Sequence, residues 1–142
     1  MKRLMVAGAA TVLACTLLSA APASAQSLPG GCTTTAGDGN ERRLEAWAYY
    51  TPLSGLDQWT QFDYRLSGKD TGDQSNVNIW VMENNSARWS YHSPDSLDVN
   101  VDYTTYASVY TVAAASEWTK FEAIFDRFLA SDPRCVGRTP SI

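Results

Sequence analysis

The sequence predicts a mainly β protein, folded as an antiparallel β-sandwich of the Ig-like or jelly-roll-like kind. Several short segments alternate apolar and polar residues, which is the pattern of a strand with one buried face. Turn-forming residues separate these segments, and two cysteines stand near the two ends of the chain that follows residue 25. These observations predict about six or seven strands. The alternative is an α+β fold, an antiparallel sheet with a helix over residues 117–129.

The first 25 residues have the pattern of a cleaved signal peptide. Two basic residues precede an apolar stretch over residues 4–18, and Ala23-Ser24-Ala25 supplies the small residues of a cleavage site. Lipidation at Cys15 is the weaker alternative, because the apolar stretch continues past that cysteine. We therefore expect a bacterial secreted protein, extracellular or associated with the cell wall.

Charge and cysteine content narrow the classes of function. Without the signal peptide the chain keeps nine basic and 15 acidic residues, a formal charge of −6, which disfavours nucleic acid or an anionic membrane as a partner. No segment beyond the signal peptide is apolar enough to span a membrane. Cys32 and Cys135 are the cysteines that remain, and in an exported chain we expect them to form a disulfide.

Residues 26–40 are rich in Gly, Thr and Ser and predict an irregular arm, followed by a single β domain over 41–135 and a tail over 136–142. Residues 44–51 predict a strand, with a short helix as the competing interpretation. Residues 59–66 predict a second strand in which one face carries Thr60, Phe62, Tyr64 and Leu66. The other face carries Trp59, Gln61, Asp63 and Arg65.

The clearest element is a hairpin over residues 77–92. A three-residue loop over 84–86 places Val81 opposite Trp89 and Ile79 opposite Tyr91, which gives one apolar face. A two-residue loop would instead place Trp80 opposite Trp89 and mix polar with apolar residues on both faces. With the three-residue loop, the outward face carries Asn78, Trp80, Met82, Arg88, Ser90 and His92.

Two more strands are predicted after the hairpin, over residues 99–104 and 106–112. Residues 116–129 fit two patterns. As a helix they would gather their aromatic residues on one stripe, and as a strand they would turn Phe121, Ala123 and Phe125 inward and Trp118, Lys120 and Glu122 outward. The strand is favoured slightly, because every preceding segment has a strand pattern.

Catalytic and metal-binding patterns are weak. His92 is the one histidine, no serine lies in a G-x-S-x-G turn, and zinc motifs are absent. Asp98, Asn100 and Asp102 match the start of an EF-hand loop, but Tyr103 stands where that loop requires glycine. Asp70 and Asp73 form a second, weaker candidate in a Gly-rich loop. We therefore expect no catalytic residue, no metal site and no cofactor, and a small hydrolase is the least favoured function.

The tryptophans carry the strongest functional signal. Four of the five share a strand face with polar residues: Trp47, Trp59, Trp80 and Trp118. Large rings flanked by polar groups suit a sugar- or protein-binding surface, unless Arg and Lys stems or a second layer cover them. The segment Trp118-Thr119-Lys120-Phe121 is also similar to the closing strand of many sandwich carbohydrate-binding modules. That likeness covers four residues and carries over no binding position.

We therefore predict a secreted, non-catalytic binding domain that recognises glycan through exposed aromatic residues. The alternative is a secreted protein-interaction or inhibitor domain that uses the same rings. The candidate ligand-binding residues lie on the two predicted outward faces and are Trp80, Arg88, His92, Trp59 and Asn78.

Overall fold

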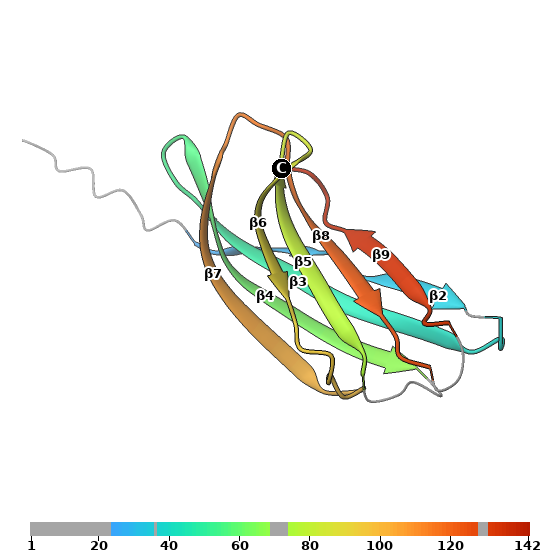
Figure 1. Ribbon diagram of the computed structural model, residues 1–142. Coiled ribbons are helices and arrows are strands. Elements are labelled where there is room, and N and C mark those ends of the chain that lie inside the picture. The colour runs from blue at the N-terminus through green and yellow to red at the C-terminus, as the bar shows by residue number, and fades with distance from the viewer. Residues whose placement is uncertain (1–23, 36, 69–73, 128–130) are drawn as a thin grey trace, which may run out of the picture.

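The protein is a sandwich of two antiparallel β-sheets (Figure 1), seen in a computed structural model that describes residues 24–35, 37–68, 74–127 and 131–142. Sheet I contains β1 (Gln26–Pro29), β2 (Cys32–Thr35), β3 (Glu41–Pro52), β4 (Leu56–Gly68) and β7 (Asp102–Val112). Sheet II contains β5 (Asn76–Glu83), β6 (Ser86–His92), β8 (Glu117–Ile124) and β9 (Arg134–Arg138). The predicted β-sandwich is confirmed.

Sheet I has the order β1-β3-β4-β7, with β2 also paired to β3, and sheet II has the order β6-β5-β8-β9. The described residues contain no helix, so the helix considered over 117–129 is not seen, and residues 128 and 129 lie outside the described part. In β8, Phe121 and Ala123 are buried and face sheet I, as the strand interpretation predicts. The alternation of inward and outward residues therefore predicts the structure of this segment correctly, and the helical stripe of aromatic residues does not.

The core lies between the inward faces of the two sheets. Phe62 of β4 stacks on Trp89 of β6, with ring centroids 5.2 Å apart, and meets Phe121 of β8 edge-on at 6.4 Å. Leu44, Leu66, Val77, Ile79 and Val81 are fully buried around these rings. The apolar residues that alternate along the strands thus meet in one continuous core.

One edge of the sandwich is closed by a disulfide and by close backbone contact. Cys32 of β2 is bonded to Cys135 of β9, as predicted, and this bond joins sheet I to sheet II. Beside it, a Cβ atom on Gly137 would lie 2.4 Å from the carbonyl oxygens of Gly30 and Gly31. The backbones can approach this closely because residue 137 is glycine and has no side chain.

The hairpin between β5 and β6 has the predicted register but a different loop. Val81 lies opposite Trp89 and Ile79 opposite Tyr91, as predicted. The connection, however, is the two-residue loop Asn84-Asn85, with φ values of 49° and 64°. A β-bulge at Arg88 adds one residue to β6 and restores the register that keeps the apolar face together. The predicted three-residue loop was therefore wrong.

A bulge in β4 changes the face on which Trp59 lies. Tyr49 pairs with Gln61 and the next residue, Tyr50, pairs with Trp59, so Thr60 is an extra residue in β4. Phe62, Tyr64 and Leu66 face the core as predicted, but the bulge turns Trp59 inward too, and its side chain is fully buried. The assignment of Trp59 to an outward binding face was wrong, because regular alternation cannot be extended across a bulge.

Three segment boundaries also differ from the predictions. The arm expected over 26–40 contains the short strands β1 and β2, which pair with β3 through their backbones. The strands expected over 99–104 and 106–112 are one strand, β7, which starts at Asp102 after Asn100, a residue with a φ of 63°. The tail expected from residue 136 belongs partly to β9. Asp98 and Asn100 therefore do not lie on a strand face with Asp102.

A buried polar cluster lies inside the sandwich, where β4 and β8 begin and β7 ends. The indole N–H of Trp59 donates to Thr111 Oγ1 at 2.9 Å and lies 3.4 Å from Glu117 Oε2, which also accepts a hydrogen bond from Thr111. Glu117 is fully buried, and its Oε1 has no hydrogen-bond partner among the described residues. Burial raises the pKa of Glu117 and of the neighbouring Asp57 from their ordinary values.

We expect Glu117→Gln to stabilise the protein at neutral pH. An acid whose pKa is raised by folding costs stability once the pH exceeds its unfolded pKa, because the folded state must then ionise a buried group. At pH 7 the variant should therefore have a free energy of unfolding higher than that of the wild type by about 1 kcal/mol or more, and a higher unfolding temperature. The gain should disappear below about pH 4, where the carboxyl is protonated in both states. Thermal unfolding followed by circular dichroism across this pH range measures it.

Glu122→Gln is the matched control for this prediction. Glu122 lies on the same strand but faces outward, where its carboxylate pairs with Arg134 at 3.3 Å. This variant should show no gain at pH 7. A Glu117→Gln protein no more stable than the wild type at pH 7 would contradict a cost from burying the ionised carboxylate.

Candidate functional site

Three of the five predicted binding residues come together on the outer face of sheet II. Asn78 lies between His92 of β6 and Glu122 of β8, and in the next row Trp80 lies between Ser90 and Lys120. The structure therefore brings together Asn78, Trp80 and His92, and it separates them from Trp59 in the core.

Neighbouring side chains already engage these residues. The Lys120 ammonium lies 4.3 Å from the centre of the Trp80 ring, and the His92 ring meets Trp80 edge-on at 5.7 Å. His92 Nδ1 lies 2.7 Å from Asn78 Oδ1, and the Asn78 amide donates to Glu122 at 3.2 Å. Trp80 is consequently half-buried, with an ammonium group over its ring.

Arg88, at the bulge of β6, is exposed and lies 3.5 Å from the carboxylate of Glu83. It is thus set apart from the row that contains Trp80.

Among the described residues, the most exposed tryptophan and tyrosine side chains lie on the opposite side of the molecule, on the outer face of sheet I. The exposed fractions are 74% for Tyr106, 48% for Tyr110 and 39% for Trp47. Tyr49 lies on the same face, because it pairs with Gln61 of β4, which in turn pairs with Tyr106 of β7. We call this surface the aromatic platform; its rings are Trp47, Tyr49, Tyr106 and Tyr110.

Polar side chains of β4 and β7 lie between these rings and are held in place by hydrogen bonds. Asp63 accepts hydrogen bonds from Gln61 at 2.9 Å and from Thr104 at 2.8 Å. The Tyr49 hydroxyl also donates to Asp63, and this bond raises the pKa of Tyr49. Further along, the Gln58 amide donates to Ser108 at 3.3 Å. The platform therefore combines free ring surface with oriented amide and hydroxyl groups.

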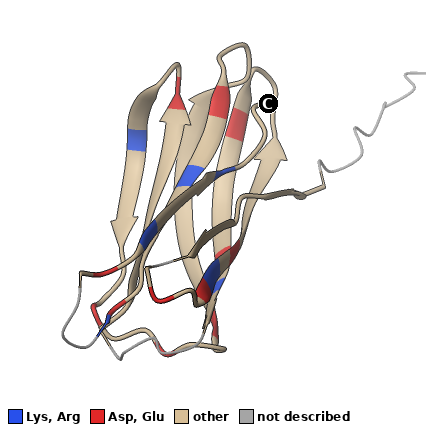
Figure 2. Cartoon of the chain, turned by 90° about the vertical axis from the view of Figure 1, so that its right-hand side faces the viewer, with Lys and Arg blue, Asp and Glu red and all other residues tan. Residues whose placement is uncertain are grey.

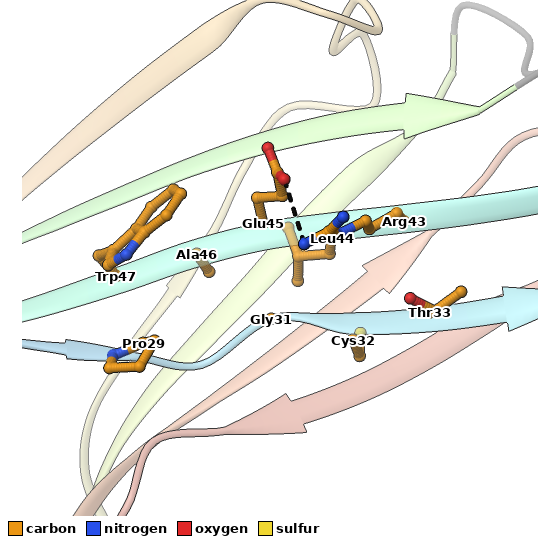
Figure 3. A pocket seen from close by; sticks show the side chains of 9 residues that line it. All are labelled: Pro29, Gly31, Cys32, Thr33, Arg43, Leu44, Glu45, Ala46 and Trp47. Atoms are coloured by element: carbon orange, nitrogen blue, oxygen red, sulfur yellow. Dashed lines mark ion pairs between the residues drawn. The ribbon is translucent and has the colours of Figure 1, made fainter.

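Trp47 stands between two shallow hollows of the platform. One, of about 310 Å³, lies where β1 and β2 meet along β3, and Figure 3 shows Arg43, Glu45 and Trp47 projecting into it from β3. The other, of about 410 Å³, is lined by Trp47, Tyr49, Asp63, Tyr64, Asp102, Tyr103 and Thr104. A ring with a hollow on each side is accessible from both sides.

The platform carries little charge. Among the described residues of the platform between Trp47 and Tyr110, Asp63 is the single charged side chain. The hollows beside Trp47 add Arg43, which pairs with Glu45 at 3.3 Å, and Asp102, which pairs with Arg65 at 3.6 Å. Charged residues gather instead at the end of the sandwich opposite the C-terminus (Figure 2). There the buried Arg42 pairs with Asp38 at 3.0 Å and lowers the pKa of Asp38.

The described residues contain no group of three or more potential metal ligands and no apolar helix of membrane-spanning length. The two acids whose pKa burial raises, Asp57 and Glu117, line neither hollow of the platform. Asp70 and Asp73, the weaker calcium candidates, lie outside the described residues.

No protein-family model matches the chain, and comparisons with curated proteins and with solved structures give no match. The functional argument therefore rests on the residues of this chain.

Sequence reasoning missed the platform because it assigned no faces to residues 106–112. The signal was present, since Tyr106, Ser108 and Tyr110 alternate with Ala107 and Val109 and are more exposed than those two residues. In addition, Trp47 shares its face with Glu45, as predicted. Only the register across β4 shows that these residues form one surface with Tyr49 and Asp63.

Proposed function

We propose that this protein is an exported, non-catalytic binding domain that recognises a neutral polysaccharide through the aromatic platform. The observation that carries the proposal is the exposure of Trp47, Tyr106 and Tyr110 on one sheet face beside oriented polar groups. Exposed aromatic surface of this extent is uncommon on a monomer unless it binds a partner. Aromatic rings stack on the apolar faces of sugars, while amides and hydroxyls bind their hydroxyl groups.

The spacing of the rings suits an extended chain. Tyr49 and Tyr106 lie on strands separated by β4, so their backbones are about 10 Å apart, and Tyr106 and Tyr110 are about 13 Å apart along β7. A glycan lying across the platform could therefore contact several rings at once. A neutral chain fits best, because Asp63 between the rings, with Glu45 and Asp102 in the hollows, would repel an acidic sugar.

Two observations support export. The first strand of the described residues begins at Gln26, immediately after the predicted cleavage site, and the Gln26 side chain accepts a hydrogen bond from Tyr50 at 2.9 Å. The pair Cys32–Cys135 is oxidised, and structural disulfides are typical of exported proteins.

The same substitution on opposite faces tests the proposal. Trp47→Ala removes a ring of the platform and should weaken binding to the polysaccharide about tenfold or more, which is the loss expected of a central aromatic contact. Trp80→Ala removes a ring on sheet II and should leave that binding unchanged. The measurement is a depletion and fluorescence titration of the purified protein against cellulose, xylan, chitin and mixed-linkage glucan.

Tyr106→Ala should weaken binding in the same direction as Trp47→Ala, since both rings belong to one surface. The circular dichroism spectra of all variants should match that of the wild type, and their unfolding temperatures should lie within a few degrees of the wild-type value. Loss of binding in Trp80→Ala with retention in Trp47→Ala would move the site to sheet II. No binding to any of the four polysaccharides would remove the proposal and favour a protein partner for the same rings.

A further inference from the structure

The outer face of sheet II carries two cations with no acidic partner among the described residues. Lys120 of β8 and Arg138 of β9 are register partners, so their side chains project side by side from the sheet. Lys120 lies over the Trp80 ring, and the Arg138 guanidinium lies 5.6 Å from the centre of the Trp118 ring. Like charges placed directly opposite each other destabilise a sheet, and this chain is acidic overall, with a formal charge of −4. An anion between the two cations would relieve that repulsion.

The neighbouring carboxylates are already engaged elsewhere. Glu122 pairs with Arg134 at 3.3 Å and accepts a hydrogen bond from the Asn78 amide. Glu83 pairs with Arg88 and accepts a hydrogen bond from the backbone N–H of Val112 at 2.7 Å. Among the described residues, Lys120 and Arg138 therefore have aromatic rings, and not carboxylates, as partners.

A hollow of about 620 Å³ lies beside the two cations. It is lined by Met82, Asn85, Trp118, Lys120, Val136, Gly137 and Arg138. Val136 is 54% exposed and Trp118 is half-buried, so the hollow offers apolar surface next to its positive charge. A small ligand that carries both a carboxylate and an apolar face would match the charge and the apolar surface of this hollow.

We propose that this hollow binds an acidic saccharide, with a uronate carboxylate held between Lys120 and Arg138. The apolar face of the sugar ring then contacts Trp118 and Val136, and the Asn85 amide, which also lines the hollow, is a polar group for the sugar hydroxyls. This site is on the other sheet from the aromatic platform and does not depend on the platform's function.

Calorimetric titration of the purified protein with an oligogalacturonate of four to six units tests the proposal. We expect binding that weakens as salt is added, and about a tenfold loss of affinity in Lys120→Gln and in Arg138→Gln. Lys120→Arg keeps the charge and should retain most of the affinity. Arg88→Gln is the matched control, because Arg88 is exposed on the same sheet but outside the hollow.

Three results would overturn the proposal. The first is no heat and no fluorescence change with oligogalacturonate at millimolar concentration. The second is unchanged affinity in the Lys120→Gln and Arg138→Gln variants. The third is equal affinity for hexaglutamate, which would show that the surface recognises charge without the sugar. Trp47→Ala should leave oligogalacturonate binding intact, so this site and the platform can fail separately.

Discussion

Replacing Cys32 and Cys135 together by serine is expected to lower the free energy of unfolding by about 4–5 kcal/mol. The two cysteines are 103 residues apart in sequence, and the chain-entropy model predicts that cross-linking so long a loop strongly restricts the unfolded chain. For a domain of this size the loss corresponds to a fall of roughly 15–25 °C in unfolding temperature. Differential scanning calorimetry of the two proteins measures it directly.

The double variant also provides its own control. A thiol reductant should destabilise the wild type to the level of the variant and leave the variant unchanged. The close backbone contact of Gly137 with Gly30 and Gly31 remains after the bond is removed. A loss of less than about 1 kcal/mol would show that this contact, rather than the disulfide, holds the edge together.

Trp59→Ala is expected to destabilise the protein by about 3–5 kcal/mol, because it removes a fully buried aromatic side chain and leaves a cavity. The change also removes the indole N–H, which donates hydrogen bonds to Thr111 and Glu117. Tyr50, which packs against Trp59 with ring centres 5.3 Å apart, also loses this contact. Urea unfolding followed by circular dichroism gives the loss.

Trp80→Ala is the same chemical change on a half-buried outer position and should cost about 1 kcal/mol or less. Trp59→Phe keeps most of the ring but loses the donor, so its stability should fall between those of Trp59→Ala and the wild type. If Trp59→Ala folded as stably as the wild type and lost only ligand binding, the inward position of Trp59 would be contradicted.

The β5–β6 hairpin shows how far polarity alone can predict register. Pairing of Val81 with Trp89 followed from the need to keep apolar residues on one face, and the structure has that pairing. The loop was mispredicted because two solutions give the same register: three loop residues, or two loop residues and a bulge. Asn84 and Asn85 accept positive φ angles, so the second solution is the one adopted.

The candidate site was predicted less well, for two physical reasons. A bulge at Thr60 reverses the alternation, so Trp59 moves into the core although Gln61 and Asp63 stay outside. In addition, a strand pattern shows which way a ring points but not what a neighbouring strand places over it. Lys120 of β8 lies over the Trp80 ring of β5, and the two positions are 40 residues apart in sequence.

The sequence by itself determined the sandwich class, most of its strands, the inward residues of regular strands and the disulfide between Cys32 and Cys135. These properties follow from local alternation and from the pairing of two cysteines, which need no knowledge of neighbouring strands. The tertiary structure decided which outer face leaves its rings accessible. Trp47, Tyr106 and Tyr110 become one surface only when β3, β4 and β7 are placed side by side in their observed register.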